Sequence, residues 1–180
     1  MIPNLELTIL RGLVINESYS RKVLPYVKDV YFETSTSRTL FQQISEYFVE
    51  YGDCPTRAAL TVGCERLEGV NEDEFRSLNE ALPLLFDDAG EENLDFLVDT
   101  TESWCKERAV YLALLEAISI HDGRGEDKGR DSIPSLLTEA LGVSFDAHVG
   151  HDYLADYNER YDFYHLKEER ISFGLTYLDK

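Results

Sequence analysis

The residues whose type and spacing come closest to a metal site are two histidines in the C-terminal third, His148 and His151. Imidazole is a common zinc ligand, but a catalytic zinc keeps three protein ligands and a structural zinc four. No third ligand stands at a set spacing from this pair. We therefore interpret both histidines as structural or solvent-facing. A small metal-dependent enzyme built on them and nearby acids is the weakest alternative.

The three cysteines, Cys54, Cys64 and Cys105, are odd in number and match no zinc or redox spacing. They are predicted to be buried or half-buried free thiols of a reducing cytoplasm. The acidic stretch 87–92 has the charge to attract calcium. It lacks the alternating ligand pattern of a calcium loop, so we interpret it as a solvated turn.

Motifs for catalysis and nucleotide binding are absent from the sequence. There is no Gly-x-x-x-x-Gly-Lys-Ser/Thr loop, and no Gly-x-Gly-x-x-Gly follows a predicted strand. No serine or cysteine stands beside a histidine in a recognisable nucleophile motif. The sequence alone therefore predicts no catalytic, cofactor-binding or metal-ligating residue, and indicates an acidic interaction domain.

Charge is distributed unevenly along the chain. The 180 residues include 17 basic and 35 acidic side chains, for a formal charge of −18. The window 65–102 holds 13 acids and two bases, and so −11 of that charge. Such a surface repels phosphate, which argues against nucleic-acid binding there. Two interpretations stay open: a merely solubilising face, or a surface for a basic protein partner.

Composition and length suit one globular domain with an appendage. Hydrophobic residues make up 43% of the chain, too many for a disordered tail. The longest apolar runs are only a few residues, which predicts neither a transmembrane helix nor a signal peptide. We expect a cytoplasmic protein with no membrane partner.

Apolar spacing predicts helices over almost the whole chain, and so an all-α fold. Short helices are expected at about 5–16 and 18–26, followed by an extended stretch at 29–33. A firmer helix follows the N-caps at 35–37 and stops at Gly52. Two more helices open at Thr56 and Asn71, the latter with Glu74 in a capping box. The expected buried positions of the third and fifth helices are Leu40, Phe41, Ile44, Tyr47, Phe48 and Tyr51, and Phe75, Leu78, Leu82 and Leu85.

The longest helix is predicted at 95–121, on the order of 40 Å long. From Val110 to Ile120 it is apolar all round, which requires cover on every side. A further helix, capped by Ser132 and ended by Gly142, makes a helical hairpin with it. Leu136, Leu137, Ala140 and Leu141 are its expected apolar face. Either this helix or another subunit covers the long helix, and the two are compatible.

The last predicted helix, at about 152–169, has an aromatic stripe of Tyr153, Tyr157 and Tyr161 at i, i+4 and i+8. Tyrosines in such a stripe are typical interface anchors, although packing on the chain's own globule is the alternative. The tail 171–180 alternates as a strand or an extended segment does. A sequence that stops just after this change is expected to be part of a longer protein.

The C-terminal third carries a resemblance to a known family. The segments Ile133–Leu137, Ala140–Asp146, Val149–Tyr153, Asp156–Tyr161 and Ile171–Lys180 resemble the replicative helicases of T-even-type phages, which are DnaB-like. Upstream, Pro25–Tyr26, Tyr31–Glu33 and Lys106–Ala109 are similar in pattern and order only. None of these motifs is catalytic, so they identify a parent protein and no active site.

The resemblance implies an N-terminal collar domain at 1–145, a linker-helix region at 146–170 and the start of a RecA-like motor domain at 171–180. It implies a hexameric ring built as a trimer of dimers through helical hairpins. Primase, and a helicase loader, are the expected partners of this primosome component. The parent would unwind DNA 5′ to 3′ with ATP and Mg²⁺, contacting single-stranded DNA through the motor domain.

The residues expected at the subunit interface of the hairpin are Tyr111, Leu112, Leu115, Ile118, Leu136 and Leu137. Those expected to dock the linker helix on a neighbour are Tyr153, Leu154, Tyr157, Tyr161 and Tyr164. Because the chain has no Walker motif, we expect it neither to bind nor to hydrolyse ATP. The alternative function is a free-standing acidic helical adaptor that binds a host or phage protein.

Overall fold

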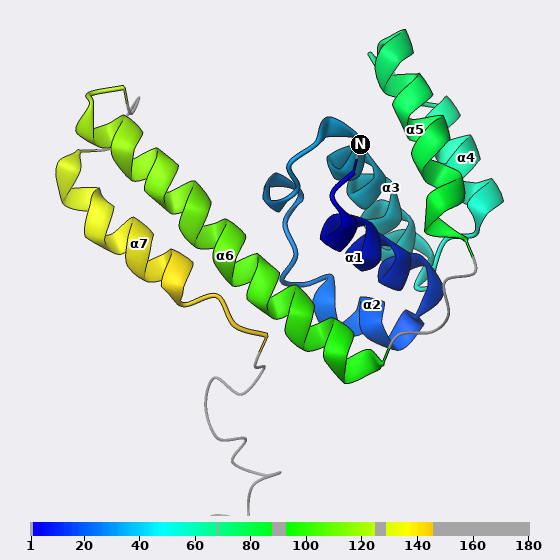
Figure 1. Ribbon diagram of the computed structural model, residues 1–180, viewed down its shortest axis with the longest axis horizontal. Coiled ribbons are helices and arrows are strands. Elements are labelled where there is room, and N and C mark those ends of the chain that lie inside the picture. The colour runs from blue at the N-terminus through cyan, green and yellow to red at the C-terminus, as the bar shows by residue number, and fades with distance from the viewer. Residues whose placement is uncertain (1, 68, 88–92, 125–128, 146–180) are drawn as a thin grey trace, which may run out of the picture. The chain divides into compact units, whose positions relative to one another are not determined.

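The computed structural model describes residues 2–67, 69–87, 93–124 and 129–145, and every regular element in these ranges is a helix (Figure 1). The predicted all-α fold is confirmed. The predicted linker helix and the alternating tail lie outside the described residues. The elements are α1 (Asn4–Ile15), α2 (Glu17–Val23), η1 (Asp29–Tyr31), α3 (Ser35–Tyr51), α4 (Arg57–Glu65), α5 (Glu72–Leu85), α6 (Leu94–His121), η2 (Arg130–Ser132) and α7 (Ile133–Leu141).

Helix starts and stops follow local sequence signals. The capping box of α5 is present. The Asn71 side chain accepts from the Glu74 N–H at 2.8 Å, and the Glu74 carboxylate accepts from the Asn71 N–H. Gly52 ends α3 with φ of 72°, a left-handed conformation that favours glycine. The N-cap of α3 is Thr34, one residue before the predicted run, and its hydroxyl accepts from the Ser37 N–H. The boundaries were thus predictable to within a few residues.

Two local predictions are wrong. Residues 29–31 form the short 3-10 helix η1 where an extended stretch was expected, because Asp29 accepts from the Val30 and Phe32 N–H groups and closes a turn. Ser132 does not cap α7 with its side chain. Since η2 runs into α7 without a break, Ser132 has a helical backbone, and its hydroxyl donates instead to the Gly129 carbonyl at 2.7 Å.

Some side chains predicted to be buried lie at the surface. Tyr51 is 62% exposed and Phe75 is 37% exposed. Phe75 lies in the first turn of α5, where no preceding turn shields it, and burial on that helix starts at Leu78. Tyr51 lies on the last turn of α3, beside a groove that the small residues of α4 leave open. Leu141, at the end of α7, is 72% exposed.

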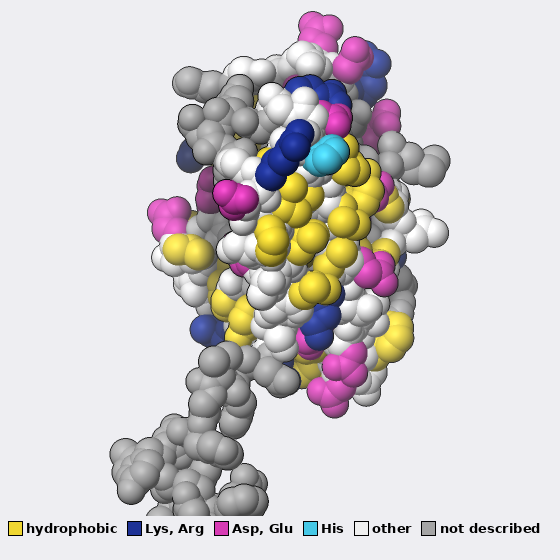
Figure 2. Space-filling view, turned by 90° about the vertical axis from the view of Figure 1, so that its left-hand side faces the viewer, with side chains coloured by type: hydrophobic (Ala, Val, Ile, Leu, Met, Phe, Trp, Pro, Cys, Tyr) yellow, Lys and Arg dark blue, Asp and Glu magenta, His cyan; other side chains and the backbone are white. Residues whose placement is uncertain are grey.

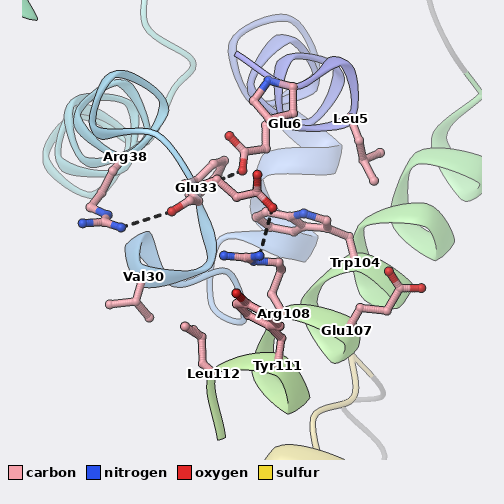
Figure 3. A pocket seen from close by; sticks show the side chains of 12 residues that line it. Leu5, Glu6, Val30, Glu33, Arg38, Trp104, Glu107, Arg108, Tyr111 and Leu112 are labelled. Carbon is pink, nitrogen blue, oxygen red and sulfur yellow. Dashed lines mark hydrogen bonds and ion pairs between the residues drawn. The ribbon is translucent and has the colours of Figure 1, made fainter. Parts of the chain in front are cut away.

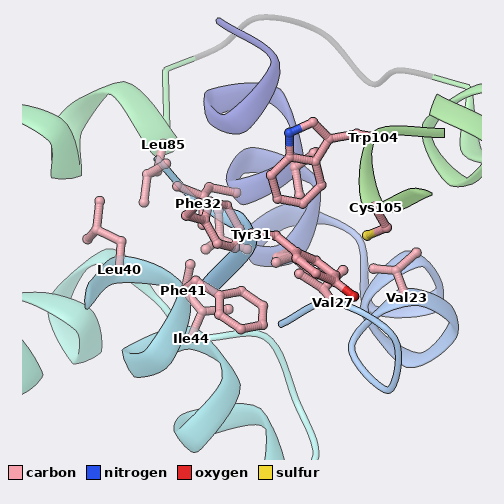
Figure 4. Packing of buried hydrophobic residues seen from close by; sticks show 14 of the residues in the cluster. Val23, Val27, Tyr31, Phe32, Leu40, Phe41, Ile44, Leu85, Trp104 and Cys105 are labelled. Carbon is pink, nitrogen blue, oxygen red and sulfur yellow. The ribbon is translucent and has the colours of Figure 1, made fainter. Parts of the chain in front are cut away.

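Aromatic side chains form the centre of the core (Figure 4). The Phe32 ring lies 5.0 Å from the Phe41 ring and 5.0 Å from the Trp104 ring, centroid to centroid. The Tyr31 ring meets Trp104 edge-on. These contacts join α3 and the segment around η1 to the first half of α6. Tyr19 of α2 is completely buried, and its hydroxyl shares a 2.5 Å hydrogen bond with the Thr101 hydroxyl of α6.

Helices α6 and α7 form the predicted hairpin, and α7 packs on α6 and η2 alone among the described elements (Figure 1). The inner face of the hairpin consists mainly of small side chains, which let the two helices approach closely: Ala109, Ala113, Ala117, Ile120 and Ala140. On the other side of α1 and α3, helices α4 and α5 pack on each other, and neither contacts α6 or α7. In the described ranges no helix is both long and apolar enough to cross a membrane.

Candidate interaction surface

An uncovered apolar stripe runs along the second half of α6. It consists of Tyr111, Leu114, Leu115 and Ile118, which are 50%, 48%, 48% and 56% exposed. Their spacing of i, i+3, i+4 and i+7 places all four on one side of the helix. Figure 2 shows hydrophobic side chains gathered along this end of the molecule, with charged side chains around them. A contiguous patch of large apolar side chains is typical of a protein–protein contact.

The stripe continues a seam of residues that is buried in the first half of the same helix. Leu97, Thr101, Trp104, Arg108, Tyr111, Leu115 and Ile118 alternate in steps of four and three. This is the spacing of a coiled-coil seam, which keeps one side of a helix facing a neighbour. Leu97, Thr101 and Trp104 are at most 6% exposed against the globular helices. From Tyr111 onward about half of each seam side chain, in Tyr111, Leu115 and Ile118, is exposed in the described chain.

Helix α7 does not cover the stripe because it packs on the other side of α6. The alanines that face α7 lie on average about half a turn from the stripe at 3.6 residues per turn. The second half of α6 is therefore covered on the α7 side and open on the stripe side. The chain's own next helix therefore accounts for one of the two sides. That another subunit covers the stripe stays a prediction.

The six residues predicted at the hairpin interface fall into two groups. Tyr111, Leu115 and Ile118 are exposed together on the stripe. Leu112, Leu136 and Leu137 are half-buried and pack against the core, and the first two line a groove of about 280 Å³ between the hairpin and η1. Leu114 was missing from the predicted set. Its place in the sequence, three residues after Tyr111 and four before Ile118, was the signal that could have included it.

A second groove, of about 840 Å³, lies at the base of the stripe, between α6 and the globular helices (Figure 3). Trp104, Glu107, Arg108 and Tyr111 line it from α6, and the opposite wall includes Pro3, Leu5, Val30 and Arg38. Leu5 and Val30 are large apolar side chains that remain 37% and 47% exposed. We call this site the base groove. Tyr111 belongs to both the stripe and the base groove, so the two form one continuous surface.

Arg108 fixes the geometry of the base groove. Its Nε donates to the Tyr31 carbonyl at 2.6 Å. Its Nη1 forms an ion pair with the Glu33 carboxylate at 3.0 Å (Figure 3). Its guanidinium also lies over the Tyr111 ring, 5.0 Å from the centroid. One side chain thus joins η1, the following segment and the first residue of the stripe, and holds the Tyr111 ring in place.

A buried carboxylate supports the opposite wall. Glu6 is 1% exposed, and it accepts from the Glu33 N–H at 2.7 Å and from the Ser37 hydroxyl at 2.6 Å. The second bond places the negative charge beside the N-terminus of α3, where the helix dipole favours it. A buried carboxylate is tolerated only when it is bonded in this way. Glu6 therefore links α1 to the segment that forms the groove wall.

No cluster of metal-ligating side chains exists in the described ranges, and His148 and His151 lie outside them. The three cysteines are free, as predicted, with Cys64 and Cys105 buried and Cys54 half-buried. Burial raises the pKa of the Cys105 thiol to about 12, which makes it a poor nucleophile at neutral pH. Burial also raises the pKa of Cys64. The geometry of the described residues suits binding through apolar contact.

The remaining predicted site residues fall outside this surface. Those of the linker helix, Tyr153, Leu154, Tyr157, Tyr161 and Tyr164, lie outside the described residues. The described acids of the window 65–102 are exposed or half-exposed on α4, α5 and the start of α6. They are separate from the stripe, so an acidic surface and an apolar surface occupy different parts of the chain.

The DnaB-like replicative helicase of Enterobacteria phage T4 is 31% identical to this chain over 180 aligned positions, which cover 96% of the chain. The alignment covers 37% of the T4 protein, so the chain spans just over a third of that relative's length. No family model matches the chain.

Proposed function

Because this chain belongs with the DnaB-like replicative helicases, matching one of them over nearly all of its residues, we propose that it is the N-terminal collar region of such a helicase. Its role there is to associate with further copies of itself and to present a docking surface for other replication proteins. The observation that carries the proposal is the uncovered seam of α6, a coiled-coil pattern that the chain's own fold leaves without a partner.

The proposal extends to the longer protein. Six collars would assemble in pairs through the hairpin, and the ring would carry ATP-dependent motors that unwind DNA 5′ to 3′ in the host cytoplasm. ATP and Mg²⁺ would bind in the motor domains, which also hold the single-stranded DNA. The linker-helix tyrosines would dock on a neighbouring subunit. Primase and a loader are the proposed protein partners, and the exposed acids of α4 and α5 suit a basic partner surface.

The energetics of the stripe indicate a weak association of the isolated collar. Burying the exposed halves of its four side chains on two copies contributes roughly 6–12 kcal/mol. Association itself costs about 4–15 kcal/mol in lost freedom of motion. The two ranges overlap, so the isolated chain should dimerise at high concentration only. Full assembly would need the additional contacts of the longer protein.

The test is light scattering coupled to size-exclusion chromatography over a range of protein concentrations. We expect the mass of the unsubstituted chain to rise toward that of a dimer. Leu115→Glu and Ile118→Glu should each weaken the dimer by about tenfold or more, because each places a charge in the buried seam. Val49→Glu is the matched control, since Val49 of α3 is 82% exposed and lies outside the hairpin.

Circular dichroism melting of the three variants checks that they fold as the parent chain does. A parent chain that stays monomeric at its highest soluble concentration would contradict the stripe as a self-association surface. Equal weakening by Val49→Glu and Ile118→Glu would also contradict it, because the effect would then come from net charge alone.

A further inference from the structure

A groove between α3 and α4 brings aromatic rings, small side chains and carboxylates together. The two helices pack on each other (Figure 1), and the groove has a volume of about 470 Å³. We propose that this groove, the tyrosine groove, binds the side chain of an arginine in a basic segment of a partner protein. The site would serve the docking part of the proposed function, on which this inference rests. It does not depend on self-association through α6, which α3 and α4 do not contact.

The shape of the tyrosine groove follows from the residue types on its two helices. Ala58, Ala59 and Gly63 line it from α4, and their small size keeps it open. Tyr47 and Tyr51 line it from α3, one helical turn apart, with their ring centroids 4.6 Å apart. Tyr51 is 62% exposed, so its ring is accessible to a ligand. The groove therefore has room for a side chain beside an aromatic wall.

Two carboxylates give the tyrosine groove a negative charge. Glu46 and Glu50 line it from α3 at positions i and i+4, and both are exposed. Like charges at this spacing destabilise a helix. In the described ranges neither carboxylate forms an ion pair with a basic side chain. A cation bound between them would offset their repulsion, so the groove is complementary to a positively charged ligand.

Hydrogen bonds hold both carboxylates in position. The Gln43 amide nitrogen donates to the Glu46 carboxylate at 3.1 Å, and the amide oxygen of Gln43 lies against Gly63 of α4. A Cβ at position 63 would lie 2.6 Å from that oxygen, so the glycine makes room for Gln43, which in turn positions Glu46. The Tyr51 hydroxyl donates to the Glu50 carboxylate, and this bond raises the pKa of Tyr51. The charges of the groove are thus fixed by its own residues.

The chain's own arginines show which cation suits such a site. Arg108 lies over the Tyr111 ring and pairs with a carboxylate at the same time. Arg21 lies over the Phe48 ring, 5.6 Å from its centroid, and is likewise paired with a carboxylate. A planar guanidinium can stack on a ring and bond a carboxylate together, whereas a lysine ammonium is a compact point charge. Because the tyrosine groove offers rings and carboxylates side by side, it favours arginine over lysine.

A basic side chain of the chain itself, Arg66 at the C-terminal end of α4, also lines the groove. Its charge partly opposes the rise in the pKa of Tyr51. Arg66 is exposed, and in the described part of the chain its side chain neither pairs with a carboxylate nor lies over a ring. It therefore leaves Glu46 and Glu50 accessible, and its positive charge would repel an incoming arginine. Removing that charge should strengthen the binding of an external arginine.

A titration followed by NMR tests the site on the whole chain. The probe is a short alanine peptide, blocked at both ends, with a single central arginine. We expect the amide signals of residues 43–51 and 57–66 to shift in a saturable way. The same peptide with lysine should bind about threefold more weakly. The peptide with citrulline, which has the shape of arginine without its charge, should give no saturable shift.

Substitutions in the groove and on α5 separate a specific site from general attraction to an acidic chain. Glu50→Gln should raise the dissociation constant of the arginine peptide by about threefold. Tyr51→Ala should raise it by about fivefold. Glu80→Gln is the matched control and should leave it unchanged, since Glu80 is an exposed acid of α5 that does not line the groove. Arg66→Gln should lower the dissociation constant by about twofold.

The positioning role of Gly63 has a separate readout. Gly63→Ala places a Cβ against the Gln43 amide and should raise the dissociation constant by about twofold. The chain should lose no resistance to urea, because alanine favours a helix more than glycine does and the end of the Gln43 side chain can move aside. Weaker binding together with a lower midpoint of urea unfolding would mean that Gly63 serves the fold and not the site.

Three results would overturn the tyrosine groove as an arginine site. They are equal binding of the citrulline and arginine peptides, equal weakening by Glu80→Gln and Glu50→Gln, and weaker binding by Arg66→Gln. The absence of any saturable shift would also overturn it, and would leave self-association through α6 standing, because light scattering measures that separately. A chain that stays monomeric but binds the arginine peptide contradicts self-association and supports the groove.

Discussion

The two halves of α6 continue one coiled-coil seam, which is buried in the first half and about half exposed in the second. In the first half Leu97, Thr101 and Trp104 are at most 6% exposed, and aromatic rings cover the seam. In the second half Tyr111, Leu115 and Ile118 are about half exposed, and the buried contact is made by alanines on another side. A single helix therefore contributes one length of its seam to the fold and leaves the next length available. The spacing of the seam does not by itself distinguish residues that pack within the chain from residues that are left exposed. That distinction depends on where the globular helices lie.

Removing an aromatic ring from each half of α6 should give the largest difference between the two halves. Trp104 and Tyr111 are one heptad apart on the seam. Trp104→Ala should lower the free energy of unfolding by about 3–5 kcal/mol, because it leaves a cavity among Tyr31 and Phe32. Tyr111→Ala should cost less than about 1 kcal/mol, since half of its ring is already in water. Urea unfolding at a concentration where the chain is monomeric measures both.

A large loss in Tyr111→Ala under those conditions would mean that the second half of the seam is covered within the monomer. The two halves of α6 would then not differ in how the monomer covers them. A small loss in Trp104→Ala would show that the core around η1 repacks without the ring.

A second substitution tests the alanine side of the hairpin. Ala113 is 5% exposed where α6 meets α7, and Ala113→Leu should separate the two helices at a cost of about 2 kcal/mol. Hydrogen exchange should speed up in α7 and in the second half of α6, with the amides of α1 to α3 little affected. Ser103→Leu, at an exposed position of the same helix, is the matched control and should leave the exchange of α7 unchanged.

If Ala113→Leu protected the hairpin as well as the parent sequence does, α7 would be held by contacts other than close helix approach. The buried alanines would then have no special part in leaving the stripe open.

Much of the fold was predictable because its signals are local. The capping box at Asn71, the stop at Gly52 and the long periodic run of α6 each depend on a few neighbouring residues. The errors arose where contacts with other helices decide whether a side chain is buried. Tyr51 and Phe75 continue their helices' apolar spacing, but they lie at helix ends where the neighbouring elements give little shelter.

The candidate surface was predictable only in part, for the same reason. The apolar sequence of residues 110–120 predicted cover on every side, and Tyr111, Leu115 and Ile118 were among the expected interface residues; the structure leaves these three about half exposed. The sequence could not show that Leu112 and Leu136 line a groove beside η1 and are partly buried within the chain itself. The base groove depends on Leu5, Val30 and Arg108, which are far apart in the sequence, and no local pattern brings them together.

The smallest expected effect concerns Glu102, at the point where the chain returns from α7 to the first half of α6. Glu102 pairs with Lys106 at 2.5 Å and accepts from the Ser144 hydroxyl at 3.2 Å. The hydrogen bond from Lys106, and those from the Phe145 backbone and Ser144, lower the pKa of the Glu102 carboxyl. A carboxylate with a lowered pKa stabilises the fold above the usual carboxyl pKa, and this contribution is lost as the pH falls through the folded-state value.

Glu102→Gln should therefore lower the free energy of unfolding by about 0.5–1 kcal/mol at pH 7, since the hydrogen bonds are partly kept and the charge is lost. Urea unfolding of both chains between pH 7 and pH 3.5 measures the difference, which isolates this group from the other acids. The difference should stay constant down to about pH 5 and shrink below about pH 4.5, where the unfolded chain already binds the proton.

A difference independent of pH would mean that packing, and not the charge of Glu102, holds residues 144 and 145 against α6. The return from the hairpin would then be fixed by apolar contact, such as the stacking of Phe145 on Tyr26 at 4.8 Å, as the first half of α6 is.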